Sequence, residues 1–143
     1  TFKLMEPPRR LADALIQLLY EFLGTALICL LFNVCFASCP SKGTFLFDYL
    51  GFLTGAYVLI LLGFNFSGAH YNPAITLAFT FRADVGRFPR PLSIAYALIQ
   101  CAGAFAGALL AAMFLECGGF LGLRNDDAKY LAQACVGEIL GSF

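Results

Sequence analysis

Charged side chains are scarce in this sequence: only 13% of its 143 residues are Asp, Glu, Lys or Arg, while 60% are hydrophobic. An ordinary soluble domain carries about 25% charged residues, so this composition excludes one. Neither sign of charge is in excess, because nine basic and nine acidic residues cancel. A nucleic-acid partner and an acidic solvating tail are therefore not indicated. We predict an integral membrane protein whose partner is the lipid bilayer.

The sequence also has little to offer for catalysis. It has one histidine, His70, and six cysteines without metal-type spacing, which we interpret as small buried hydrophobic side chains. Ser67 and His70 lack a third partner that would complete a nucleophile and its base. We therefore predict that the protein is not an enzyme and has no catalytic residue, cofactor or metal site.

Long uncharged stretches divide the sequence into membrane segments. A bilayer core needs about 20 apolar residues in a helix. The prediction is an all-α transmembrane fold with three full spans, a re-entrant half-helix and the start of a fourth span. All of them belong to a single membrane domain, residues 1–143. The three full spans are residues 11–37, 45–66 and 91–115, the re-entrant loop and half-helix are residues 67–81, and the fourth span starts over residues 129–143.

Positive charge is unequal on the two predicted sides of the membrane. One side has three basic residues, namely Lys42, Arg124 and Lys129. The other has six, namely Lys3, Arg9, Arg10, Arg82, Arg87 and Arg90. Since basic residues favour the cytoplasmic side, we predict a cytoplasmic N-terminus, in the plasma membrane or in an internal one.

The pair Asn72-Pro73 interrupts the longest uncharged stretch. Tyr49 to Phe81 is 33 residues, too long for one span and too short for two. Asn is a favoured N-cap and Pro is favoured in the first helical position, so a new helix should run over residues 73–81, about half of the bilayer core. Residues 65–71 are then expected to be non-helical, which the membrane tolerates only where backbone lines water or is buried in protein.

Two sequence patterns suggest how the helices are arranged. Glu21-Phe-Leu-Gly-Thr25 returns as Glu138-Ile-Leu-Gly-Ser142, an offset of 138 minus 21, or 117. Three spans separate the copies, so the repeat is inverted and a functional site is expected at the midplane. A second Asn-Pro would fall near position 189, so we expect the sequence to be part of a longer one. Glycines four residues apart, at 51 and 55 and at 103 and 107, are expected to let helices pack closely.

Four motifs in order resemble one family. They are Glu21-Phe-Leu-Gly-Thr25, SGAHYNPAIT from residue 67, Tyr96-Ala-Leu-Ile-Gln100 with the glycines that follow, and Glu138-Ile-Leu-Gly141. These are similar to motifs of the aquaporin and glycerol-facilitator, or major intrinsic protein, family. Nearly the whole chain matches, but only the first half of the family's inverted-repeat bundle. Two departures are Ser142, where threonine is usual, and the missing second Asn-Pro-Ala loop.

The resemblance implies a passive channel for water and small neutral solutes, such as glycerol, that excludes ions and protons. It also implies a homotetramer. Asn72 would cap the half-helix and donate its NH2 group to water, while the carbonyls of residues 67–70 would accept hydrogen bonds. The implied pore-lining and selectivity residues are Phe52, Gly68, Ala69, His70, Asn72, Pro73, Ala74 and Ile75. The implied structural residues are Glu21, Gln100, Gly103, Gly107 and Glu138.

Several alternatives remain open at this point. A secondary transporter with inverted repeats also uses a broken helix, although coupling charges beside the break are missing here. His70 is either an orienting, hydrogen-bonded residue or a gate or ligand. The two glutamates either brace the loops or relay protons. Phe52 either lines a constriction or is an ordinary lipid-facing or core aromatic residue. A chain complete at 143 residues would need an antiparallel partner. Water, glycerol and ammonia are not distinguished as solutes.

Overall fold

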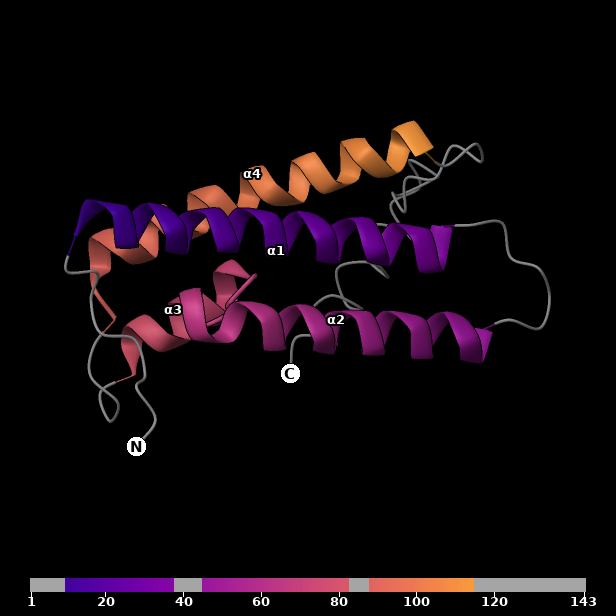
Figure 1. The fold of residues 1–143 in the computed structure, drawn as a ribbon, viewed down its shortest axis with the longest axis horizontal. Helices are drawn as coiled ribbons and strands as arrows, with labels where there is room; N and C mark the ends of the chain where they lie inside the picture. Colours follow the sequence, from indigo (N-terminus) through magenta and orange to yellow (C-terminus); the bar gives the residue numbers. More distant parts are fainter. Residues whose placement is uncertain (1–9, 38–44, 83–87, 115–143) are drawn as a thin grey trace, which may run out of the picture.

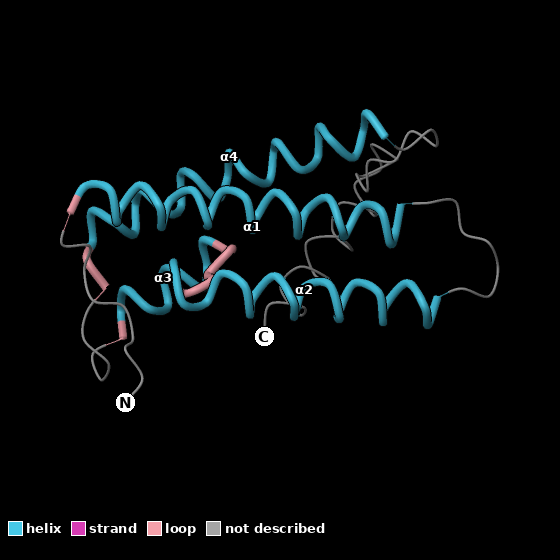
Figure 2. Tube along the Cα trace, in the orientation of Figure 1, coloured by secondary structure: helices cyan, strands magenta, loops and turns pink. Residues whose placement is uncertain are grey.

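The computed structural model describes residues 10–37, 45–82 and 88–114. Every regular element in these ranges is a helix: α1 Leu11–Ala37, α2 Phe45–Ser67, α3 Pro73–Phe81 and α4 Arg90–Phe114 (Figure 2). The all-α prediction is therefore confirmed. The predicted fourth span, residues 129–143, and Glu138 lie outside the described residues.

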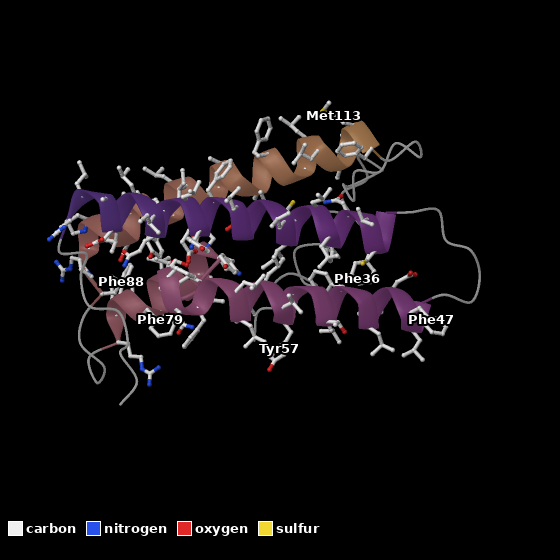
Figure 3. All side chains as sticks on the ribbon, in the orientation of Figure 1. Phe36, Phe47, Tyr57, Phe79, Phe88 and Met113 are labelled. Carbon is white, nitrogen blue, oxygen red and sulfur yellow. The ribbon has the colours of Figure 1, made fainter. Side chains whose placement is uncertain are left out.

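Three of these helices are long and apolar enough to cross a membrane, namely Leu11–Phe36, Leu46–Ser67 and Arg90–Phe114. Their outward faces carry large apolar side chains, such as Phe47, Tyr57 and Met113 (Figure 3). A membrane stabilises such faces because it replaces water with hydrocarbon, and within the helices every backbone group can be paired. The nine residues of α3 extend only about 14 Å, roughly half of a bilayer core.

Helix α1 lies between α2 and α4, and α3 packs against α4 (Figure 1). Helices α1 and α4 run in the same direction and approach closely at two glycines of α4. A Cβ atom built on Gly103 would lie 2.5 Å from the Phe22 carbonyl oxygen, and one on Gly107 would lie 2.2 Å from that of Ala26. Both spacings are too short for any side chain, so these glycines allow the two backbones to meet.

The second pair of glycines behaves differently. A Cβ on Gly55 would lie 2.5 Å from the side chain of Leu31, so α1 and α2 are also tightly packed there. A Cβ on Gly51 would meet only Cys35 Sγ at 3.8 Å, which is an ordinary contact. The expectation of close packing therefore applies to Gly55 and not to Gly51.

Helix α2 ends later than the sequence indicated. Residues 65–67 were expected to be non-helical, but the helix continues through Ser67, and the Gly68 N–H still donates to the Phe64 carbonyl at 3.1 Å. Gly68 then adopts φ 87°, a left-handed conformation that costs glycine little and ends the helix. Only residues 68–72 separate α2 from α3, as a short loop coloured pink in Figure 2.

Candidate functional site

The first turn of α3 is capped by the residue that the sequence predicted. Asn72 has extended backbone, with φ −152° and ψ 127°, and its Oδ1 accepts a hydrogen bond of 2.8 Å from the Ala74 N–H. Pro73 occupies the first helical position, where its missing N–H is not needed. Since Oδ1 is used for the cap, the Nδ2 group of this exposed side chain has no hydrogen-bond partner among the described residues.

A single buried carboxyl group holds the loop before α3. Glu21 on α1 is fully buried. Its Oε1 accepts from the His70 N–H at 3.0 Å, and its Oε2 accepts from the Tyr71 N–H at 2.7 Å. Gln100 on α4 donates its Nε2 to the same Oε2 at 2.7 Å. One side chain therefore satisfies three donors and ties the loop to α1 and α4, as buried polar groups require.

The hydroxyl group of Thr76 extends this network into α3. It lies 3.0 Å from Gln100 Nε2 and 3.0 Å from His70 Nδ1, and it donates to the Asn72 carbonyl at 3.2 Å. Thr76 and Gln100 are both buried. The loop, α3 and α4 are thus connected through one hydroxyl group directly behind the capping residue.

The imidazole ring of His70 is buried rather than exposed. It stacks on Phe79 with ring centroids 4.8 Å apart and contacts Phe88 at 5.4 Å and Tyr96 at 5.5 Å. Only 2% of the residue is exposed, and Nε2 has no hydrogen-bond partner among the described residues. The ring therefore packs among aromatic side chains and does not reach the exposed surface of the loop.

The other predicted residues near the loop form an exposed strip. Its members are exposed or partly exposed and lie on either side of the buried pair His70 and Tyr71, namely Gly68, Ala69, Asn72, Pro73, Ala74 and Ile75. The Ser67 carbonyl does not join them, because Ser67 is buried and its carbonyl accepts from the Tyr96 hydroxyl at 3.0 Å. Of the residues 67–70 whose carbonyls were expected to accept hydrogen bonds, Gly68 and Ala69 are partly exposed, whereas Ser67 and His70 are buried.

Phe52 lies apart from this strip, near the other end of α2. Its half-buried ring makes edge contacts with two aromatic residues of α1, Phe32 at 5.5 Å and Phe36 at 5.6 Å between centroids. Ser67, at the end of α2, lies 15 positions after Phe52, about 22 Å along the helix axis. The structure brings Glu21, Gln100 and the loop together and does not bring Phe52 to them.

Sequence reasoning gave no role to three residues that hold the site. They are Thr76, Tyr71 and Tyr96. Tyr96 lies four residues before Gln100, so the two share a face of α4, and this spacing was the available signal for it. Among the described residues there is no group of three His, Cys, Asp or Glu side chains suited to a metal ion.

Comparison with known proteins identifies the family. The sequence profile of the major intrinsic protein family matches residues 9–143. Aquaporin NIP1-3 of Oryza sativa subsp. japonica is 40% identical over 104 residues, covering 68% of this chain and 35% of that protein. Aquaglyceroporin AqpS of Rhizobium meliloti is 40% identical over 85 residues, covering 56% of this chain and 35% of that protein.

A third relative matches more of the chain. The "Probable glycerol uptake facilitator protein" of Thermotoga maritima is 35% identical over 131 residues, which cover 87% of this chain and 54% of that protein. The chain therefore spans about a third to about half of the length of these relatives. No solved structure matches it significantly.

The three apolar helices and the family match together define an integral, multi-pass membrane protein. The chain belongs to the major intrinsic protein family.

Proposed function

We propose that this chain forms part of a passive membrane channel for water and small neutral solutes. The exposed strip, made of Gly68, Ala69 and residues 72–75, would be one wall of the pathway. The observation that carries the proposal is the capped start of α3. There Asn72 presents an unused Nδ2 donor on the surface while Glu21 fixes the loop behind it. In this proposal the start of α3 lies near the middle of the membrane.

Water would pass by exchanging hydrogen bonds along the strip. In this proposal the Asn72 Nδ2 group donates, and the carbonyls of the partly exposed residues Gly68 and Ala69 accept. A water molecule in the pathway then loses hydrogen bonds to other water molecules but gains hydrogen bonds to the protein, so its free energy changes little along the pathway. Pore diameter and these lining groups together would decide which solutes enter.

Ions would be excluded by the same geometry. The N-terminus of a helix carries about half a positive charge, so the start of α3 repels a cation that has shed its hydration shell. Protons would be excluded at a water molecule whose oxygen accepts two hydrogen bonds from fixed donors. Both of its lone pairs are then occupied, so it cannot accept a proton from the neighbouring water molecule and pass it on. Asn72 supplies one of these donors, and the inverted half of the channel would supply the other.

The remaining parts of the proposal concern orientation, assembly and chemistry. Helix α1 begins, α3 ends and α4 begins at the same end of the bundle (Figure 1), and basic residues Arg10, Arg82 and Arg90 flank those helix ends. This agrees with a cytoplasmic N-terminus. We also propose a homotetramer, no enzymatic activity and no cofactor.

The test compares two variants of the complete protein reconstituted in proteoliposomes. Asn72→Asp keeps the capping oxygen but removes the NH2 group and adds negative charge, so water flux should fall and cation leakage should rise. Asn72→Ser also caps the helix but adds no charge, so it should still exclude cations. Unchanged cation exclusion in Asn72→Asp would contradict the role of Asn72. Flux that saturates or depends on an ion gradient would instead favour a secondary transporter.

A further inference from the structure

The side chain of Tyr71 fills a space that exists only because two neighbouring residues are glycines. A Cβ atom on Gly24 of α1 would lie 2.0 to 2.5 Å from three carbons of the Tyr71 ring. A Cβ on Gly63 of α2 would lie 1.7 Å from the Tyr71 hydroxyl oxygen. Real Cβ atoms essentially never come within 3.0 Å of another heavy atom, so neither position tolerates a side chain while the ring is in place. We call the space bounded by Gly24 and Gly63 the glycine slot.

Tyr71 is held at its backbone, its ring and its hydroxyl group. Its φ is 47°, a left-handed conformation that is rare for a bulky residue and unfavourable for its backbone. The Tyr71 N–H donates to Glu21, and the hydroxyl group donates to the Leu59 carbonyl of α2 at 3.2 Å. Only 8% of the residue is exposed. These contacts stabilise a backbone conformation that the residue would otherwise avoid.

We infer that Tyr71 is a positioning residue whose fit in the glycine slot sets the position of Asn72, and through it the ratio in which solutes pass. This inference rests on the proposed channel function. Consecutive Cα atoms are only about 3.8 Å apart, so a displacement of Tyr71 is passed directly to Asn72. A methyl group on Gly63 would require the hydroxyl oxygen to move by at least 3.0 minus 1.7, or 1.3 Å.

The ratio of two permeabilities separates positioning from simple loss of folded protein. Fewer folded channels lower water and glycerol permeability by the same factor, whereas a displaced Asn72 changes them by different factors. The experiment measures both fluxes in proteoliposomes that carry the complete protein. We expect Gly63→Ala to change the glycerol-to-water ratio by more than about threefold, because selectivity depends on the width and lining of the pore.

A second substitution tests the fit directly. Leu is shorter than Tyr and lacks the hydroxyl group that the new methyl group would meet, so Gly63→Ala combined with Tyr71→Leu should return the ratio towards that of the wild type. Gly51→Ala, on the same helix with its nearest neighbour at 3.8 Å, is the matched control and should leave the ratio unchanged. If Gly63→Ala yields no folded protein, Tyr71→Leu alone serves as the test. Beside the native glycine, the shorter side chain leaves the glycine slot incompletely filled and loosens the loop, so the ratio should also change, whereas in the double variant the added methyl group occupies the space that the hydroxyl group leaves.

The outcomes distinguish the two proposals. A wild-type protein that conducts no water above protein-free vesicles overturns the channel function and this inference with it. A wild type that conducts, with Gly63→Ala and Tyr71→Leu lowering both fluxes by one common factor, overturns the inference alone. A changed ratio that Tyr71→Leu does not restore in the double variant contradicts the proposed fit.

Discussion

Replacing Glu21 by Gln tests the brace behind the loop with the smallest possible change of shape. In the native protein the two carboxyl oxygens accept from the His70 N–H, the Tyr71 N–H and Gln100 Nε2. A glutamine has only one side-chain oxygen. Placed at the Oε2 position, it keeps the bonds to Tyr71 and Gln100, but its NH2 group then faces the His70 N–H, so a buried donor is left unpaired.

The expected magnitude follows from counting these donors. One unpaired buried N–H costs about 1–3 kcal/mol, so Glu21→Gln should lower the free energy of unfolding by that amount. Glu21→Leu leaves all three donors unpaired, a cost of roughly 3–9 kcal/mol if the effects add. That is a large part of the roughly 5–15 kcal/mol that stabilises a typical protein, so we expect little folded protein from the leucine variant.

The assay is equilibrium unfolding in mixed micelles, followed by circular dichroism as the fraction of denaturing detergent rises. Asp13→Asn is the matched control because it makes the same carboxyl-to-amide change on α1. Asp13 is exposed, and within the described part of the chain its side chain accepts only from the Arg10 N–H. The control should unfold like the wild type. If Glu21→Gln also unfolds like the wild type, the carboxyl group does not hold the loop, and the account of the site is wrong.

Two further predictions concern packing around the site. Gly107→Ala places a methyl group 2.2 Å from the Ala26 carbonyl oxygen, so it should force α1 and α4 apart and lower the free energy of unfolding by about 1–3 kcal/mol in the same assay. The added methyl group of Gly51→Ala meets no close neighbour, so this substitution should leave the free energy of unfolding unchanged or raise it by up to about 1 kcal/mol. Equal effects of the two glycine substitutions would argue against a backbone contact at Gly107. Tyr96→Phe removes the hydroxyl group that binds the Ser67 carbonyl and should cost about 0.5–1.5 kcal/mol, whereas an unchanged stability would show that this buried hydrogen bond contributes nothing.

Local chemistry made part of the site predictable from the sequence. Asn and Pro specify the start of a helix through their own side chains, so the start of α3 at Pro73 follows from two adjacent residues. Uninterrupted apolar stretches likewise predicted the three long helices. The predicted end of α2 was less accurate. The helix continues until Gly68 adopts a left-handed conformation, and nothing in residues 65–67 indicates that they remain helical.

Contacts between distant residues were not predictable in the same way. Glu21 and His70 are 49 residues apart, and only the repeat and the family resemblance pointed to a link between the glutamate and the loop. The loop has positive φ at Gly68, Ala69 and Tyr71, which redirects its side chains. The burial of the His70 ring and the insertion of Tyr71 between two glycines therefore depend on tertiary structure and not on sequence spacing.

The most direct test of the proposed channel is a thiol placed at Ala74, which is exposed beside Asn72. Ala74→Cys would be made in a background without the six native cysteines, and water flux would be measured before and after treatment with a small water-soluble thiol reagent. Mass spectrometry would verify the modification. The account predicts that modification blocks most of the water flux. Complete modification with unchanged flux would contradict it, because the start of α3 would then lie outside the water pathway.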